Sequence, residues 1–255
     1  MKELGRRLMR VASYNIHDGI GLDGEFRLDR IARVIGGMNV DLIGLQEVPR
    51  YLRAASGLDS IRALAEATGM YGAFAPSYTW YGVGPVGSES GKGLEWPQYG
   101  NGLLSRYPIR WVETHPLPYF ETRGAYVERR GLLEALIAGP EQDFMVMVTH
   151  LGLDAYERQQ QVEEIVARMR TVGRPLIFMG DCNSEPSSDP IVALTRMLTV
   201  VPVEVAPGWT FPAASPDRQL DYIFVRGFMI QRNLFTGVSD ASDHLPVLAE
   251  IDQVK

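Results

Sequence analysis

Short apolar segments that end in polar residues constrain this chain more than any other feature. Apolar runs of this length predict buried β-strands, and apolar residues at helical spacing predict amphipathic helices. Strands are predicted at residues 10–16, 41–48, 102–105, 131–138, 144–149, 175–179, 221–225 and 245–251, and helices at residues 27–38, 58–68, 155–171 and 190–198. Strands outnumber helices, which favours a layered α/β arrangement with sheets inside and helices outside.

The length and composition indicate one domain spanning residues 1–255. The chain has 255 residues, a hydrophobic fraction of 45% and a single cysteine, Cys182. One domain can fill this length, and one cysteine excludes an intrachain disulfide. Because Cys182 points away from its polar neighbours on a strand, we expect it to pack inward.

The balance of acidic and basic residues indicates which class of substrate the chain binds. Asp and Glu total 31 against 25 Lys and Arg, a net charge of -6. Proteins that grip long nucleic acids usually present a basic face, so a phosphorylated small molecule or a lipid headgroup is favoured over nucleic acid. No feature indicates a protein partner. The basic N-terminus lacks the apolar segment of a signal peptide, and no apolar run spans a membrane, which predicts a cytoplasmic location.

Residues 76–100 contain Tyr78, Trp80, Tyr81, Trp96 and Tyr99 among several glycines. The segment is too long for an ordinary connection. It is either a functional or mobile surface loop or a variable insertion.

Six polar clusters follow or precede the predicted strands. They are Asn15-Ile16-His17, Gln46-Glu47, Thr149-His150, Asp181-Cys182-Asn183, Leu220-Asp221 and Ser242-Asp243-His244. Polar groups at strand ends converge while the apolar strand bodies pack beneath them. Each motif alone also fits a turn, a helix cap or a solvated strand end. Six in one chain indicate a single site.

The residue types in these clusters suit a hard cation. Carboxylates and an amide favour Mg²⁺, with Mn²⁺ or Ca²⁺ as alternatives, over Zn²⁺. Glu47 and Asp243 would bind the ion. Hydrolysis also needs a base for water, which Asp181 would supply, and groups that orient and neutralise a phosphate. Those groups would be Asn183, His150 and His244, with Asp221 holding His244.

The ordered motifs resemble the endonuclease/exonuclease/phosphatase superfamily. The matching segments are residues 13–16 (Ser-Tyr-Asn-Ile), 41–48 (Asp-Leu-Ile-Gly-Leu-Gln-Glu-Val), 100–109, 149–151 (Thr-His-Leu), 180–183 (Gly-Asp-Cys-Asn), 220–225 and 242–247 (Ser-Asp-His-Leu-Pro-Val). They cover nearly the whole chain. The resemblance implies a four-layer αββα sandwich in which two packed mixed β-sheets lie between helices.

The resemblance also implies residue roles. Glu47, helped by Asn15 and Asp243, would hold the metal, and Asp181 would be the base or water-orienting group. Asn183, His150 and His244 would contact the phosphate, with Asp221 supporting His244. The expected activity is metal-dependent hydrolysis of a phosphoester, with a phosphodiester favoured.

Four further residues are weaker candidates for substrate binding: Asn101, His17, Arg130 and Trp209. His115 has no acidic neighbour in sequence, so we expect it in a surface loop. Two alternatives to a small-molecule or lipid-headgroup hydrolase remain. One is a DNA or RNA endo- or exonuclease. The other is a catalytically silent binding module, which the retained Glu47 and Asp181 disfavour.

Overall fold

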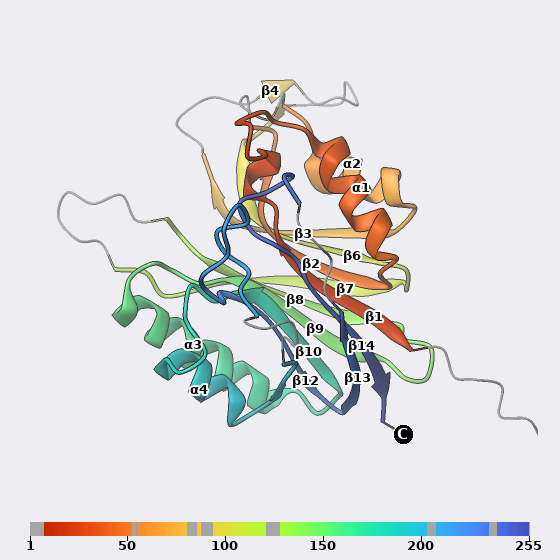
Figure 1. Ribbon diagram of the computed structural model, residues 1–255, viewed down its shortest axis with the longest axis vertical. Helices are drawn as coiled ribbons and strands as arrows, with labels where there is room; N and C mark the ends of the chain where they lie inside the picture. The colour runs from red at the N-terminus through yellow and green to blue at the C-terminus, as the bar shows by residue number, and fades with distance from the viewer. Residues whose placement is uncertain are drawn as a thin grey trace, which may run out of the picture.

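The computed structural model describes residues 8–52, 55, 57–80, 86–87, 94–120, 128–202, 208–234 and 239–254. Two six-stranded sheets pack face to face, with α1 and α2 on the outer face of one and α3 and α4 on the outer face of the other (Figure 1). This arrangement confirms the predicted αββα sandwich with two mixed sheets.

The first sheet is built around the N-terminal strand. Its order is β13 (Phe228–Leu234), β14 (Val247–Gln253), β1 (Met9–Asn15), β2 (Leu42–Arg50), β6 (Gln98–Ser105) and β3 (Tyr71–Thr79). β1 and β2 are parallel and the other pairs are antiparallel. A short 3₁₀ turn, η1 (His17–Gly19), follows β1 directly.

The second sheet is also mixed. Its order is β11 (Thr199–Val200), β12 (Asp221–Arg226), β10 (Leu176–Asp181), β9 (Phe144–His150), β8 (Gly131–Ile137) and β7 (Ile109–Pro116). β9 and β10 are parallel and their neighbours are antiparallel. β4 (Val86–Gly87) and β5 (Leu94–Glu95) pair separately.

Local sequence explains where the helices begin and end. The helices are α1 (Leu28–Met38), α2 (Ser60–Thr68), α3 (Ala155–Thr171) and α4 (Asp189–Thr195). Asp59 and Asp154 accept hydrogen bonds from backbone N–H groups in the first turns of α2 and α3. Asn39 and Gly69 adopt the left-handed conformation that terminates α1 and α2.

Three apolar clusters separate the four layers. The central cluster joins both sheets and includes Val11, Val148 and Met179. The other two lie between a sheet and its helices; Ile31 belongs to one and Ile165 to the other. Burial on both faces explains why the central strands are continuous apolar runs.

The strands that sequence did not predict lie at the sheet edges. β3, β7, β11 and β13 are the edge strands of the two six-stranded sheets, and their apolar runs are short or interrupted. Most residues of β7 are exposed, so β7 lacks the continuous apolar run from which buried strands are predicted. The segment 76–100 is accordingly part strand, since β3 runs to Thr79 and β6 starts at Gln98. Residues 81–85 and 88–93 of that segment lie outside the described residues.

Gly44 on β2 marks a close approach of the two sheets. A Cβ atom there would lie 3.0 Å from both Cγ atoms of Val148 and 3.4 Å from the Met179 Cβ. We predict that Gly44→Val lowers the free energy of unfolding by about 1–3 kcal/mol through overpacking. Urea denaturation measures this change.

Gly36→Ala is the matched control, because a Cβ at this exposed position in α1 meets no atom within 4 Å. It should raise the free energy of unfolding by about 0.5–1 kcal/mol. Equal stability of Gly44→Val and the wild type would contradict the close sheet contact.

Candidate active site

Strand register places three predicted residues in one row of the second sheet. Asp181, the last residue of β10, pairs with His150 at the end of β9 and with Asp221 at the start of β12. In the first sheet, Asn15 at the end of β1 pairs with Gln46, which places Glu47 next to it. The polar clusters therefore meet at one end of the sandwich.

Asn15 connects the two sheets. Its buried Nδ2 donates to Glu47 Oε1 and to Asp181 Oδ2, both at 3.0 Å. Its Oδ1 accepts the His17 N–H, and its backbone oxygen accepts the Ser242 hydroxyl at 2.7 Å. Both polar atoms of the Asn15 side chain therefore form hydrogen bonds to other residues of the site.

Asp181 is the buried carboxylate at the centre of the site. Its Oδ1 accepts the Asn183 N–H at 2.9 Å. Its Oδ2 lies 3.4 Å from His150 Nε2 and 3.6 Å from His244 Nε2. Burial, assisted by the charge of Asp221, raises the pKa of Asp181 to about 7. A carboxyl with this pKa can exchange protons near neutral pH, as a general base requires.

His244 forms a buried ion pair with Asp221. Its Nδ1 lies 2.8 Å from Asp221 Oδ2, and its ring packs 4.7 Å from that of Phe211. Burial alone would lower the pKa of His244. The charge and hydrogen bond of Asp221 outweigh burial and raise the pKa to about 10. His244 is therefore an imidazolium at neutral pH, and its Nε2 lies 3.6 Å from Asp181 Oδ2.

His150 has the opposite electrostatic environment. Burial lowers its pKa well below the ordinary value, and the charges of Arg130 and His244 lower it further. Arg130 Nη1 lies 2.9 Å from His150 Nδ1 and also donates to Glu128 at 2.9 Å. Asn183 Nδ2 lies 3.0 Å from His150 Nε2. The site thus contains one neutral and one charged imidazole.

The residues around Glu47 fit a cation. The carboxyl of Asp18 lies close enough to Glu47 that burial and the charge of Glu47 raise its pKa to about 7. Asp18 Oδ1 is buried and accepts no hydrogen bond from the described residues. The pKa of Glu128 is also raised, by burial and by Glu47 despite Arg130. A cluster of buried carboxylates of this kind suits a hard divalent ion.

Another group with metal-ligand spacing consists of Asp181, Asp221 and His244, whose ligand atoms lie within 4.8 Å of one another. The Asp221–His244 hydrogen bond already occupies His244 Nδ1. Asp221 raises the pKa of His244, so a metal ion bound by this group would have to compete with a proton for the imidazole. The carboxylates of Glu47 and Asp18 are a second group that could hold a cation.

Backbone conformation marks the same site. Six non-glycine residues of the described chain have positive φ, and four of them are His17, Asp18, Glu47 and Asn183. This region is unfavourable for residues with a Cβ, and such residues concentrate at functional sites. The main chain thus adopts strained conformations where it presents Glu47 and Asn183.

The remaining candidates occupy varied positions. His17 Nδ1 lies 3.7 Å from Asp243 Oδ1 and 3.1 Å from the Ile20 carbonyl. Asn101 is buried and donates to the Gly131 carbonyl, so its side chain connects β6 to β8. Trp209 is 42% exposed, two residues before Phe211.

The expectation for His115 was wrong. It is buried beneath α3, and its Nε2 lies 2.8 Å from Glu134. The partner comes from the adjacent strand β8, so no local sequence signal reveals it. Cys182 is buried, as expected. Sequence analysis missed Glu128 and Phe211, which contact Arg130 and His244.

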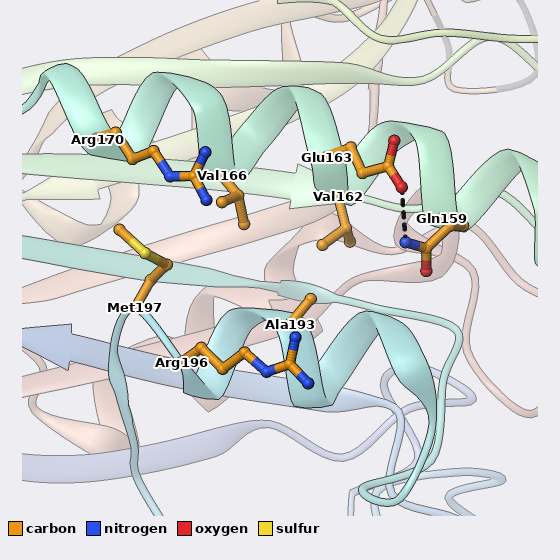
Figure 2. Close-up of a pocket in the computed structure, with 8 residues that line it drawn as sticks. All are labelled: Gln159, Val162, Glu163, Val166, Arg170, Ala193, Arg196 and Met197. Carbon is orange, nitrogen blue, oxygen red and sulfur yellow. Dashed lines mark hydrogen bonds between the residues drawn. The ribbon is translucent and has the colours of Figure 1, made fainter.

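A separate groove lies between α3 and α4. It has a volume of about 300 Å³, and Figure 2 shows the side chains that line it: Gln159, Val162, Glu163, Val166, Arg170, Ala193, Arg196 and Met197. Gln159 donates to Glu163 at one end. None of the residues predicted to act in hydrolysis lines this groove, so it lies apart from the candidate site.

Comparison with known proteins shows the family to which the chain belongs. The endonuclease/exonuclease/phosphatase family model matches residues 12–244, and the chain belongs to this family. Members of the family hydrolyse phosphoester bonds and generally depend on divalent metals.

The similar proteins named below match nearly the whole of this chain. The uncharacterized protein YbhP of Escherichia coli (strain K12) is 28% identical, with 95% of each chain covered. An endonuclease/exonuclease/phosphatase from Beutenbergia cavernae has a similar structure, with a TM-score of 0.74, 24% identity, and 98% of this chain and 72% of that chain covered. The mannosyl-6-phosphatase Bt3783 of Bacteroides thetaiotaomicron has the same fold, with a TM-score of 0.71, 19% identity, and 96% and 99% covered. Among the described residues, no helix combines the length and apolar character needed to cross a membrane.

The Asp221–His244 pair gives a prediction that does not depend on activity. We expect the His244 ring to stay protonated up to about pH 10 in the wild type. In Asp221→Asn the charge and hydrogen bond that raise the pKa most are changed while burial remains, so the pKa of His244 should fall well below its wild-type value. NMR titration of the ring resonances measures both values.

Asp217→Asn is the matched control, because Asp217 is exposed and pairs with Arg218. It should leave the titration of His244 unchanged. A His244 pKa that is the same in Asp221→Asn as in the wild type would contradict the assigned ion pair.

Proposed function

We propose that this protein is a divalent-metal-dependent hydrolase that cleaves a phosphoester bond with water activated by Asp181. The observation that supports this most directly is the convergence of His150, His244 and Asn15 on Asp181. A buried carboxylate with a pKa near 7 is surrounded by N–H donors. That combination suits removal of a proton beside an anionic phosphoryl group.

Each residue has a distinct part in the proposed reaction. Asp181 accepts the proton of the attacking water, and the neutral amide of Asn183 orients the phosphoryl group. His150 donates through Nε2 to a phosphoryl oxygen. His244, protonated and held by Asp221, stabilises the negative charge that develops in the transition state.

Glu47, Asn15 and Asp243 would hold the metal, and the Asp18 carboxyl lies close to Glu47. A bound Mg²⁺ would polarise the phosphoryl oxygens and neutralise their charge. The Asn15 amide donates to both Glu47 and Asp181. It would keep the metal-binding carboxylate and the base at a fixed separation.

The proposed substrate is a phosphorylated small molecule or a lipid headgroup. The net charge of -6 supports this, because a long nucleic acid requires compensation of many phosphates. Sharing a fold with a sugar phosphatase is compatible with a small substrate. A panel containing an aryl phosphodiester, sugar and inositol phosphates, phospholipids and single-stranded DNA separates these classes.

Asp181→Asn and His244→Ala test the mechanism on the best substrate of that panel. Each removes a group that acts in the transition state, so we expect kcat to fall about 10²- to 10⁴-fold. Chelation of divalent ions should abolish turnover, and added Mg²⁺ should restore it. Steady-state kinetics with purified protein measures these effects.

Asp143→Asn is the control, since Asp143 pairs with Arg110 away from the strand ends that form the site. It should retain wild-type kcat. Near wild-type turnover of Asp181→Asn or His244→Ala, or full activity in chelator, would refute the proposed mechanism.

A further inference from the structure

Arg130 is buried beside the reacting groups and does not lie on the solvated edge of β8. Only 4% of it is exposed. Its Nη1 donates to Glu128 Oε1 at 2.9 Å and lies 2.9 Å from His150 Nδ1. A guanidinium has only donors and keeps its charge at all relevant pH values. At this contact His150 Nδ1 must therefore be the acceptor.

The second ring nitrogen of His150 faces another donor. Asn183 Nδ2 lies 3.0 Å from Nε2, and the same Nδ2 donates to the Leu151 carbonyl at 2.8 Å. Because the Leu151 carbonyl needs a donor, the NH₂ group of Asn183, and not its oxygen, must face Leu151 and the His150 ring. A neutral imidazole has one acceptor nitrogen, so the two N–H groups compete for it.

Arg130 is the stronger of the two donors to the acceptor nitrogen of His150. A hydrogen bond from a charged donor is roughly twice as strong as one from a neutral amide. The carboxylate nearest to Nδ1, Glu47 Oε1, is 3.8 Å away and beyond hydrogen-bond distance. On the other side of the ring, Asp181 Oδ2 lies 3.4 Å from Nε2 and can accept a hydrogen. Every contact except that with Asn183 places the hydrogen on Nε2.

We propose that Arg130 is a positioning residue that holds His150 as the Nε2–H tautomer. The Nε2–H of His150 and the free N–H of Asn183 are then adjacent donors that need a shared acceptor beside Asp181. An anionic oxygen is such an acceptor. The assignment of this acceptor as a phosphoryl oxygen rests on the proposed function, whereas the tautomer itself does not.

Glu128 completes the arrangement. Its carboxylate accepts from the Arg130 Nη1 that also contacts His150, which directs the guanidinium towards Nδ1. The resulting chain runs from Glu128 through Arg130 to His150. The effect of this chain is to set which nitrogen of His150 carries the hydrogen and faces Asp181.

¹⁵N NMR tests the proposal directly, because protonated and unprotonated ring nitrogens have well-separated chemical shifts. The chain has four histidines, and the signals lost in His150→Gln identify His150. The metal-free wild type should show unprotonated Nδ1 and protonated Nε2. In Arg130→Met, Asn183 is the remaining donor to the ring among the described residues, and the signals should shift towards the Nδ1–H form.

Two variants separate Arg130 from its surroundings. Arg129→Met removes the neighbouring guanidinium, which lies over the Tyr119 ring, and should leave His150 as Nε2–H. Asn183→Ala should also leave it as Nε2–H, since the proposal gives Asn183 no part in that choice. An Nδ1–H tautomer in the wild type overturns the proposal even if Arg130→Met fails to fold. Retention of Nε2–H in folded Arg130→Met overturns it as well.

Kinetics on the best phosphoester then tests the role in turnover. Arg130→Met should lower kcat about 10- to 100-fold, with a smaller change in KM, while Arg129→Met keeps wild-type kcat. A shifted tautomer with unchanged kcat would refute the positioning role. A wild type that hydrolyses no phosphoester would refute the proposed function, and the NMR result would still decide whether Arg130 sets the tautomer.

Discussion

The amide of Asn15 joins the two β-sheets where the polar strand ends meet. Nδ2 reaches Glu47 from the same sheet and Asp181 from the other. The backbone oxygen of Asn15 also accepts from Ser242, whose Oγ in turn accepts the His244 N–H. Strand order alone brings these residues into one region, but among the described residues this buried amide is the one that hydrogen-bonds to carboxylates of both sheets. Its position depends on close packing of the sheets, which the glycine at position 44 allows.

The site has two regions that differ in how far their carboxylate charges are compensated. Around Glu47, burial and the charge of Glu47 raise the pKa of Asp18 and of Glu128, so this region can accommodate an external cation. Around Asp181, the imidazolium of His244 partly compensates the negative charges of Asp181 and Asp221. Asn15 contacts both regions yet carries no charge. Asn15 therefore connects the acidic region around Glu47 to the region around Asp181 without adding a charge to either.

Sequence was sufficient for features that depend on one strand and its end. Central strands such as β9 and β10 are apolar on both faces, so composition predicts them, and the polar residues that follow were expected to converge. The register of His150, Asp181 and Asp221 agrees with this expectation. The edge strands β3, β7, β11 and β13 could not be found in the same way, because one side of each has no neighbouring strand and its residues alternate or face solvent.

The side-chain contacts that sequence missed are those made by pairs distant in the chain. His115 is paired with Glu134 because β7 and β8 are adjacent, and Phe211 covers His244 because its loop crosses the strand ends. Arg130 was visible as a charge before a strand, but its direction depends on Glu128 and His150 together. Residue type predicted which groups can act on a phosphate. Which nitrogen each imidazole presents depends on these neighbours, and only the folded arrangement supplies them.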